Sequence, residues 1–347
     1  MTGVQTCALP ISPRRLLVDC GAKETARLLA PRIAALKPVR GRPLFELFVL
    51  THIDADHING VLPLFTQPAL HGAFGDIWFN GTPQMTRFLS VKQGDEFSTL
   101  LGDAQAQWPW NRAFTPDGRV PPQPVVVAGE ALPTVDLPGG LRLTLLAPRP
   151  TQLSKMATQW AAELKPQPAR LARTPRPLPD PKTVDLQALA AARSPADASA
   201  PNGSSIALLA EYAGGAVLLA GDAHVPGVVA SLRLLLQARG LKRLPLSALK
   251  LSHHGSANAT SVELLSLIDC PRYLVSTDGS IFQHPDVEAM ARVIVHGGPR
   301  PTLCFNHRVE RTAYWDNAAL KRRYGYLTQY PEKGRKGLRL TLDANPT

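Results

Sequence analysis

The ten-residue run 51–60 constrains the fold most, because it follows directly on the apolar segment 44–50 and is dense in metal-binding side chains. It contains two imidazoles and two carboxylates, those of His52, Asp54, Asp56 and His57. Alternate side chains of an extended chain point the same way, so the first three can converge on one cation and a turn can bring in the fourth. Both groups are common metal ligands. The spacing predicts a metal site at the end of a buried strand, with Gly60 allowing the next turn.

Three later blocks carry the same kinds of side chain. Gly221-Asp222 follows the apolar residues 218–220, the segment 250–256 reads Lys-Leu-Ser-His-His-Gly-Ser, and His284 precedes Pro285. Each of these blocks alone has a structural explanation, respectively a strand-to-loop turn, a hydrogen-bonded histidine and a loop residue, just as the run 51–60 alone could be a solvated turn. Their joint occurrence favours one shared site.

The four blocks resemble those of the metallo-β-lactamase fold, in the order that this family shows along the chain. The run 51–60 is similar to its His-x-His-x-Asp-His signature, except that Asp54 stands where the second histidine usually is. This His-x-Asp-x-Asp-His form, with the Lys-x-x-His-His-Gly-Ser block, resembles the hydrolase domain of the DNA-uptake protein ComEC and its stand-alone relatives. The resemblance implies a four-layer αββα sandwich with the motif loops along one edge.

The resemblance also implies two divalent metal ions and a role for each matching residue. His52 would bind the first ion, Asp56 and His57 the second, Asp222 would bridge the two, and His284 would complete the second site. The family's usual third histidine is missing, and Asn202 is the nearest candidate. The expected metal ligands are His52, Asp54, Asp56, His57, Asp222, His253 and His284. The expected supporting residues are Asp19, Asn202, His254 and Ser256.

Catalytic roles are expected for Asp56, His253 and Lys250. His253 can supply the missing donor or give a proton to the leaving group, and Lys250 can hold a phosphate. Asp19 is expected to orient the metal loop by hydrogen bonds. Asp54 adds an oxygen donor, which shifts preference toward Mn, Mg or Fe(II) while Zn stays open.

Divalent ions bridged by a carboxylate make hydrolysis the natural reaction. The favoured function is a phosphodiesterase or nuclease. The alternatives are a hydrolase of a small ester or other carbonyl substrate, and a non-catalytic binding or sensor module on the same fold, because fold alone does not decide function. Nucleic acid or another phosphodiester is the expected partner.

The N-terminal residues 1–11 resemble the translation of a sequencing adapter fused to a truncated gene, although a short native tail is the alternative. Residues 15–21 resemble the family's second or third strand with its Asp-x-Gly turn, so an earlier strand is expected to be missing. The remainder, 12–347, is predicted to be one domain. A Pro-rich segment at about 165–201 interrupts it, and its composition predicts a mobile insertion outside the core, with a short helix at 186–192.

Composition limits the setting of the protein. The formal net charge is +11, which could steer a polyanion or simply be solvated surface. The four cysteines form neither a disulfide framework nor a Cys-x-x-Cys zinc motif, and no run approaches membrane-spanning length. These features predict a cytoplasmic protein without a membrane partner. The rest of the chain alternates strand-like and helix-like segments. Strands are expected at 16–19, 44–50, 75–80, 204–212 and 216–219, the last two joined by a hairpin at the glycine pair 214–215, and a helix is expected at 225–239. This alternation predicts a sheet covered by helices.

Overall fold

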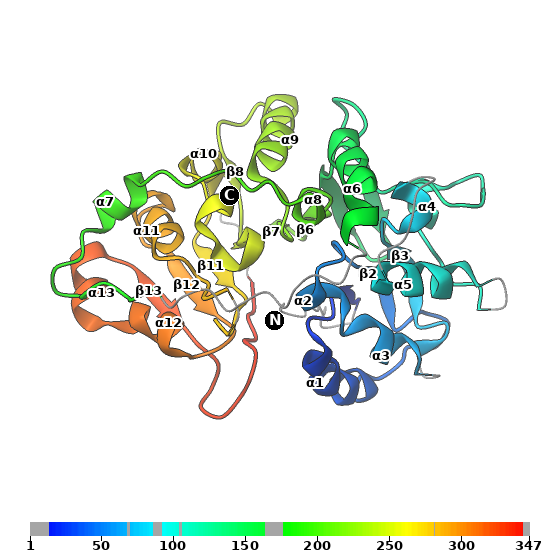
Figure 1. The fold of residues 1–347 in the computed structure, drawn as a ribbon, viewed down its shortest axis with the longest axis horizontal. Helices are drawn as coiled ribbons and strands as arrows, with labels where there is room; N and C mark the ends of the chain where they lie inside the picture. The colour runs from blue at the N-terminus through cyan, green and yellow to red at the C-terminus, as the bar shows by residue number, and fades with distance from the viewer. Residues whose placement is uncertain are drawn as a thin grey trace.

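Two sheets carry the fold, which is mixed α/β as the sequence predicts (Figure 1). The structure is a computed structural model that describes residues 14–67, 70–85, 92–103, 106–163, 176–280 and 282–342. The predicted tail 1–11 lies outside the described residues. Within the described ranges, no helix has the length and apolar character needed to cross a bilayer.

The smaller sheet is parallel, in the order β1-β2-β3. Its strands are β1 (Leu16–Val18), β2 (Phe45–Val49) and β3 (Phe74–Trp78). All three were predicted, within two residues at each end. Strand β2 is buried along its whole length because both of its faces are covered. Phe48 belongs to a core on the helix side, whereas Leu47 and Val49 belong to a core shared with the larger sheet.

The larger sheet has eight strands in the order β13-β12-β11-β9-β7-β6-β5-β4. In chain order they are β4 (Thr134–Leu137), β5 (Leu141–Ala147), β6 (Ala207–Tyr212), β7 (Gly215–Leu219), β9 (Ala248–Lys250), β11 (Arg272–Val275), β12 (Thr302–Phe305) and β13 (Leu327–Gln329). Strands β4 to β7 pair antiparallel, and β7 to β13 pair parallel. A separate parallel pair joins β8 (Leu244–Pro245) and β10 (Ile268–Asp269).

The hairpin between β6 and β7 turns one residue earlier than its glycine pair suggests. Tyr212 pairs with Gly215, so the two-residue loop is Ala213-Gly214. Both loop residues have positive φ, 47° and 80°. Such angles suit the twist of a two-residue hairpin. Gly215 therefore belongs to the strand and not to the turn.

Helices cover the outer faces of both sheets. The α-helices are α1 (Lys23–Ala34), α2 (Ala55–Ile58), α3 (Val61–Phe65), α4 (Thr82–Met85), α5 (Lys92–Gly102), α6 (Pro150–Glu163), α7 (Leu186–Ala191), α8 (Ala200–Gly203), α9 (Val225–Arg239), α10 (Val262–Ser266), α11 (Val287–His296), α12 (Glu310–Ala313) and α13 (Ala318–Tyr324). Short 3-10 helices occur at η2 (Arg112–Phe114), η3 (Ser252–Gly255), η4 (Ala257–Ala259) and η5 (Tyr314–Asp316). Figure 1 shows α1, α3 and α5 beside β2 and β3, and α11, α12 and α13 beside β12 and β13.

Three apolar cores follow from this arrangement. One joins the smaller sheet to α1, α3, α5 and α6, and it includes Phe48, Phe65 and Trp108. A second joins the larger sheet to α9, α10, α11 and α13. The third lies between the two sheets, where Leu47 and Trp78 meet residues of β5 and β6. The loop with Trp108 and Trp110 is thus a packed turn, because both indoles are buried in or beside the first core.

Residues 176–199 of the Pro-rich segment, here called the strap, pack against the core, so the prediction that the insertion lies outside the core is wrong for them. Within the strap, α7 packs on α11, and Val184, Leu186 and Ala190 are buried in the core of the larger sheet. Arg292, which is 5 % exposed, donates hydrogen bonds to the Ala190 and Ala192 carbonyls. Three apolar side chains are enough to pack this segment against the core, although its overall composition predicted no such packing. Residues 164–175 lie outside the described part.

Candidate metal centre

The candidate site lies where several parallel strands end. Asp19 follows β1, His52 follows β2, Asp222 follows β7, and His253 and His254 follow β9. Strands β1 and β2 are parallel neighbours in the smaller sheet, and β7 and β9 are parallel neighbours in the larger one. A backbone hydrogen bond of 2.9 Å from the Ile206 N–H to the Thr51 carbonyl joins the two sheets beside these loops. The topology therefore gathers segments far apart in sequence at one edge.

Asp222 is the centre of the cluster. Its Oδ2 lies 3.4 Å from His57 Nε2, 3.6 Å from His254 Nε2 and 3.9 Å from His52 Nε2. Asp56 Oδ2 lies 2.9 Å from His254 Nε2 and 3.9 Å from His57 Nε2. Two overlapping groups of potential metal ligands result. They are His52, His57 and Asp222, and Asp56, His57 and His254.

The donor atoms have the spacing that a cation requires. Two ligand atoms about 2.1 Å from a tetrahedral ion stand about 3.4 Å apart, and the contacts around Asp222 have nearly this separation. His52 Nε2, His57 Nε2 and Asp222 Oδ1 are buried and have no hydrogen-bond partner among the described residues. Buried polar atoms are normally paired. The residues present therefore fit a bound metal ion, which would satisfy these atoms together.

The Nδ1 atoms of the three histidines contact protein groups outside the cluster. His57 Nδ1 lies 2.8 Å from Asp19 Oδ2, and His254 Nδ1 donates to the Ser276 carbonyl at 2.7 Å. The Thr51 hydroxyl lies 3.0 Å from His52 Nδ1 and also contacts Asp19. Such contacts fix the tautomer of a metal-binding imidazole and aim its Nε2 lone pair. All three Nε2 atoms consequently face Asp222.

The cluster carries an excess of buried negative charge. Burial raises the pKa of Asp222, but the His57 and His254 imidazoles outweigh it and hold that pKa well below its usual value. Burial lowers the pKa of His57, but the carboxylates of Asp222, Asp19 and Asp56 hold it well above its ordinary value. Burial lowers the pKa of His254 to about 4. A bound cation would compete with protons for these groups, so metal uptake is expected to depend on pH.

The structure groups three histidines differently from the prediction. His254, expected to support the site, lies inside the second group, whereas His253 and His284 lie in neither group. His253 Nδ1 is 3.2 Å from Asp197, and His284 Nδ1 is 3.7 Å from Asp286. The His254 and His284 ring centroids are 6.4 Å apart, so His284 adjoins the cluster.

The remaining predicted residues lie around the cluster. Asp54 Oδ2 is 3.7 Å from His52 Nε2 and its side chain is 26 % exposed, so it borders the open side. Lys250 is buried and donates to the Leu251 carbonyl at 2.9 Å. The Asn202 amide donates to Asp197, and the Ser256 hydroxyl donates to Asn258. The side chains of Lys250 and Ser256 thus form hydrogen bonds with other protein groups.

Sequence reasoning missed Asp197 and His224. Asp197 Oδ1 lies 3.8 Å from His224 Nε2, and its Oδ2 accepts from Asn202. Asp197 was overlooked because it belongs to the strap, which was expected to be mobile. His224 carried a signal, because it stands only two residues after Asp222.

Two glycines allow the loops around the cluster to approach each other closely. Gly60 has an ordinary φ, so its turn does not require glycine; a Cβ there would lie 2.3 Å from the Cys20 carbonyl oxygen. Gly221 has φ +52°, and its Cβ would lie 2.4 Å from Ser205 Oγ. Gly60 is therefore required because the two backbones lie so close together. Gly221 is required for the same reason and also because of its positive φ.

Gly221→Ala is expected to lower the free energy of unfolding by about 1–3 kcal/mol and to weaken metal uptake, because the strained backbone would displace Asp222. Thermal melts and metal content measure the two effects. Gly240→Ala is the control, since Gly240 also has positive φ but no atom within 4 Å of a Cβ. Equal metal uptake by the two variants would show that Gly221 does not position Asp222.

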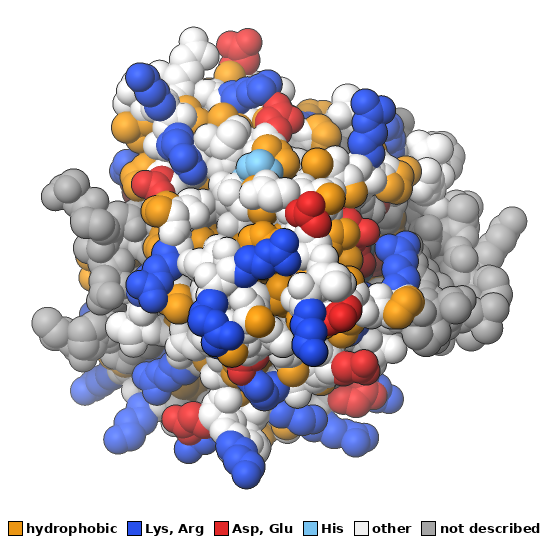
Figure 2. Space-filling view, turned by 90° about the vertical axis from the view of Figure 1, so that its left-hand side faces the viewer, with side chains coloured by type: hydrophobic (Ala, Val, Ile, Leu, Met, Phe, Trp, Pro, Cys, Tyr) orange, Lys and Arg blue, Asp and Glu red, His pale blue; other side chains and the backbone are white. Residues whose placement is uncertain are grey.

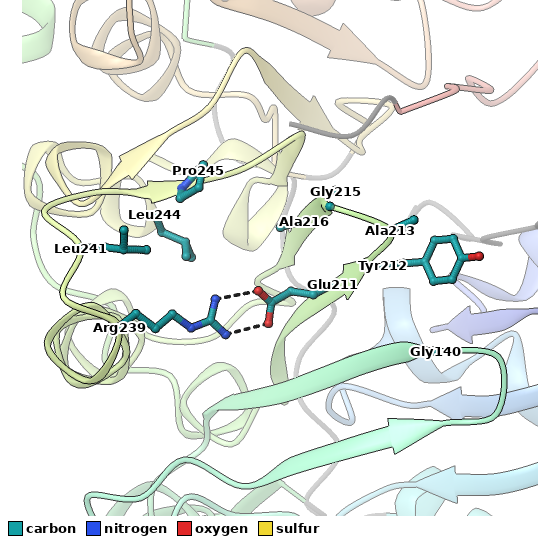
Figure 3. A pocket seen from close by; sticks show the side chains of 11 residues that line it. Gly140, Glu211, Tyr212, Ala213, Gly215, Ala216, Arg239, Leu241, Leu244 and Pro245 are labelled. Atoms are coloured by element: carbon teal, nitrogen blue, oxygen red, sulfur yellow. Dashed lines mark hydrogen bonds and ion pairs between the residues drawn. The ribbon is translucent and has the colours of Figure 1, made fainter. Parts of the chain in front are cut away.

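A separate surface depression lies at the turn of the β6–β7 hairpin (Figure 3). Its charged lining residues, Glu211 and Arg239, are joined by two hydrogen bonds of 2.6 and 2.8 Å. Asp222 follows the opposite end of β7. This depression is therefore separate from the metal cluster, and its charges already neutralise each other.

A comparison of the chain with models of protein families and with curated protein sequences found no match. The fold and the site therefore define the class: a mixed α/β protein whose buried His and Asp groups could hold a metal ion.

Proposed function

We propose that the protein is a metal-dependent hydrolase of phosphodiesters, with two divalent ions held at the His/Asp cluster. The carrying observation is the convergence of three buried Nε2 atoms on the single carboxylate of Asp222. His52 and Asp54 would serve one ion, Asp56, His57 and His254 the other, and Asp222 both. When bound, such ions polarise a phosphoryl oxygen and supply hydroxide near neutral pH.

We also propose a specific fold family for the chain. Three apolar cores, each between two layers, support an αββα sandwich of the metallo-β-lactamase type. The order of the four motif blocks and their meeting at one edge support the ComEC-type branch. The mixture of imidazole and carboxylate donors supports Mn, Fe(II) or Zn as the metal.

Local charge supports an anionic substrate better than net charge does. On the face drawn in Figure 2, Lys and Arg side chains are interspersed with Asp, Glu and apolar ones. Beside the site, however, the Arg176 N–H donates to Gln283, the neighbour of His284, and the Arg311 guanidinium donates to the Arg176 carbonyl. Two arginines thus come together next to the loop that carries His284. An anionic chain that reached this loop would be favoured by these two positive charges.

Chelation is expected to abolish hydrolysis of bis(p-nitrophenyl) phosphate and of single-stranded nucleic acid, and Mn or Zn should restore it, because the cluster residues need the cation to act. Steady-state assays on the full chain, with p-nitrophenyl acetate as the control substrate, measure this. A metal-loaded protein that cleaves the ester and no phosphodiester would overturn the substrate class. A metal-loaded protein that cleaves neither would favour a binding module.

A further inference from the structure

The Asp197 carboxylate is built into the site from the strap. It accepts hydrogen bonds from the Asn202 amide at 2.8 Å and from the Ser199 N–H at 2.9 Å, and it lies 3.2 Å from His253 Nδ1. Its side chain is 10 % exposed. The Asn202 amide nitrogen also lies 3.3 Å from His253 Nδ1, but it donates its shorter bond to Asp197. A carboxylate only accepts, so in its contact with Asp197 the Nδ1 of His253 carries the hydrogen. The contact therefore fixes both the tautomer and the orientation of that ring.

The backbone turns His253 and His254 toward different partners. Both have positive φ, 46° and 56°, which is uncommon for residues other than glycine. Two hydrogen bonds hold this conformation, from the His253 N–H to the Gly221 carbonyl and from the Ser256 N–H to the His253 carbonyl. His254 consequently reaches Asp56, while His253 reaches Asp197.

His253 is, with His224, one of two accessible imidazoles around the cluster. Its side chain is 20 % exposed, against 0 % for His52, 1 % for His57 and 4 % for His254. The centroids of the His253 and His254 rings are 6.0 Å apart. A substrate at the cluster can therefore touch His253 without displacing a ligand.

Arg292 ties the strap to the loop that follows the two histidines. It donates to Ala192 and Ser194 on the strap and, at 2.8 Å, to the Thr260 carbonyl on that loop. A buried guanidinium that bridges two segments keeps them in register, since breaking either set of bonds leaves buried charge unpaired. Arg292 thereby keeps Asp197, on the strap, in a fixed position relative to His253.

We propose that Asp197 is a positioning residue that acts through His253: by holding Nδ1, it presents the Nε2 edge of that imidazole to the phosphoryl group of the substrate. This inference rests on the proposed function, because it names a contact to the same substrate. It also gives the strap a role in the site.

Asp197→Asn is expected to lower kcat by about 10²-fold and to leave metal content unchanged, because a misoriented His253 no longer meets the phosphoryl group. In a His253→Gln background, Asp197→Asn should cause no further loss. Additive losses would show a general structural role and overturn the proposal. Asp180→Asn is the matched control, an exposed aspartate on the same strap.

A second measurement does not depend on turnover. In Zn-loaded protein with ¹⁵N-labelled histidine, inorganic phosphate should shift the Nε2 signal of His253, assigned through His253→Gln, and the shift should be lost in Asp197→Asn. No shift in the wild type, or equal shifts in both proteins, would overturn the proposal. A phosphate shift without any phosphodiester cleavage would sink the proposed function and leave the positioning contact standing.

Discussion

Replacing Asp222 with asparagine should lower metal-dependent hydrolysis by roughly 10³-fold, since one carboxylate oxygen lies within 3.9 Å of three histidine nitrogens. An amide has nearly the same shape but carries no negative charge. The variant should also lose the stabilisation that metal gives, which is about 2.7 kcal/mol when free metal is 100 times its Kd. Thermal melts with and without Mn or Zn measure this gain, and metal content and kcat measure the rest.

Asp76→Asn is the burial-matched control for this experiment. Asp76 is 8 % exposed, and its carboxylate accepts bonds from the Trp78 indole and the Ala113 N–H, away from the cluster. That variant is expected to melt lower but to keep the full gain on adding metal. If Asp222→Asn keeps the gain as well, the cluster is a structural ion-pair network and not a metal centre.

Leu186→Ala should lower the free energy of unfolding by about 2–5 kcal/mol, because the side chain is fully buried in the core of the larger sheet. Urea or thermal unfolding measures the change. Gln187→Ala, at an exposed position on the same helix, should change stability by less than about 0.5 kcal/mol. Equal stability of the two variants would restore the view of the strap as a dispensable insertion.

Deleting residues 180–199 should be more damaging than the point change. It removes Leu186 together with the groups that pair with Arg292, and an unpaired buried guanidinium strongly destabilises a fold. The sequence pointed to the opposite result, since a Pro-rich segment with few large apolar residues is expected to contribute little to a core.

The mixed α/β class and most helices and strands can be predicted from the amino-acid sequence alone. Helix α9 (Val225–Arg239) was predicted with its observed bounds, and β2 and β7 within one residue at each end. The sequence also singled out the run 51–60 and Asp222 as potential ligands. These features are local, because apolar periodicity and motif spacing are properties of neighbouring residues.

The histidines that face the cluster and the packing of the strap could not be predicted in this way, because both depend on the tertiary structure. His253 and His254 are adjacent and chemically identical, and the left-handed backbone at both positions sends one to Asp197 and the other to Asp56. Asp197 and His253 are 56 residues apart, and nothing local marks their contact. Side-chain direction and long-range pairing depend on how distant segments pack, so the sequence reveals the candidate ligands but not their partners.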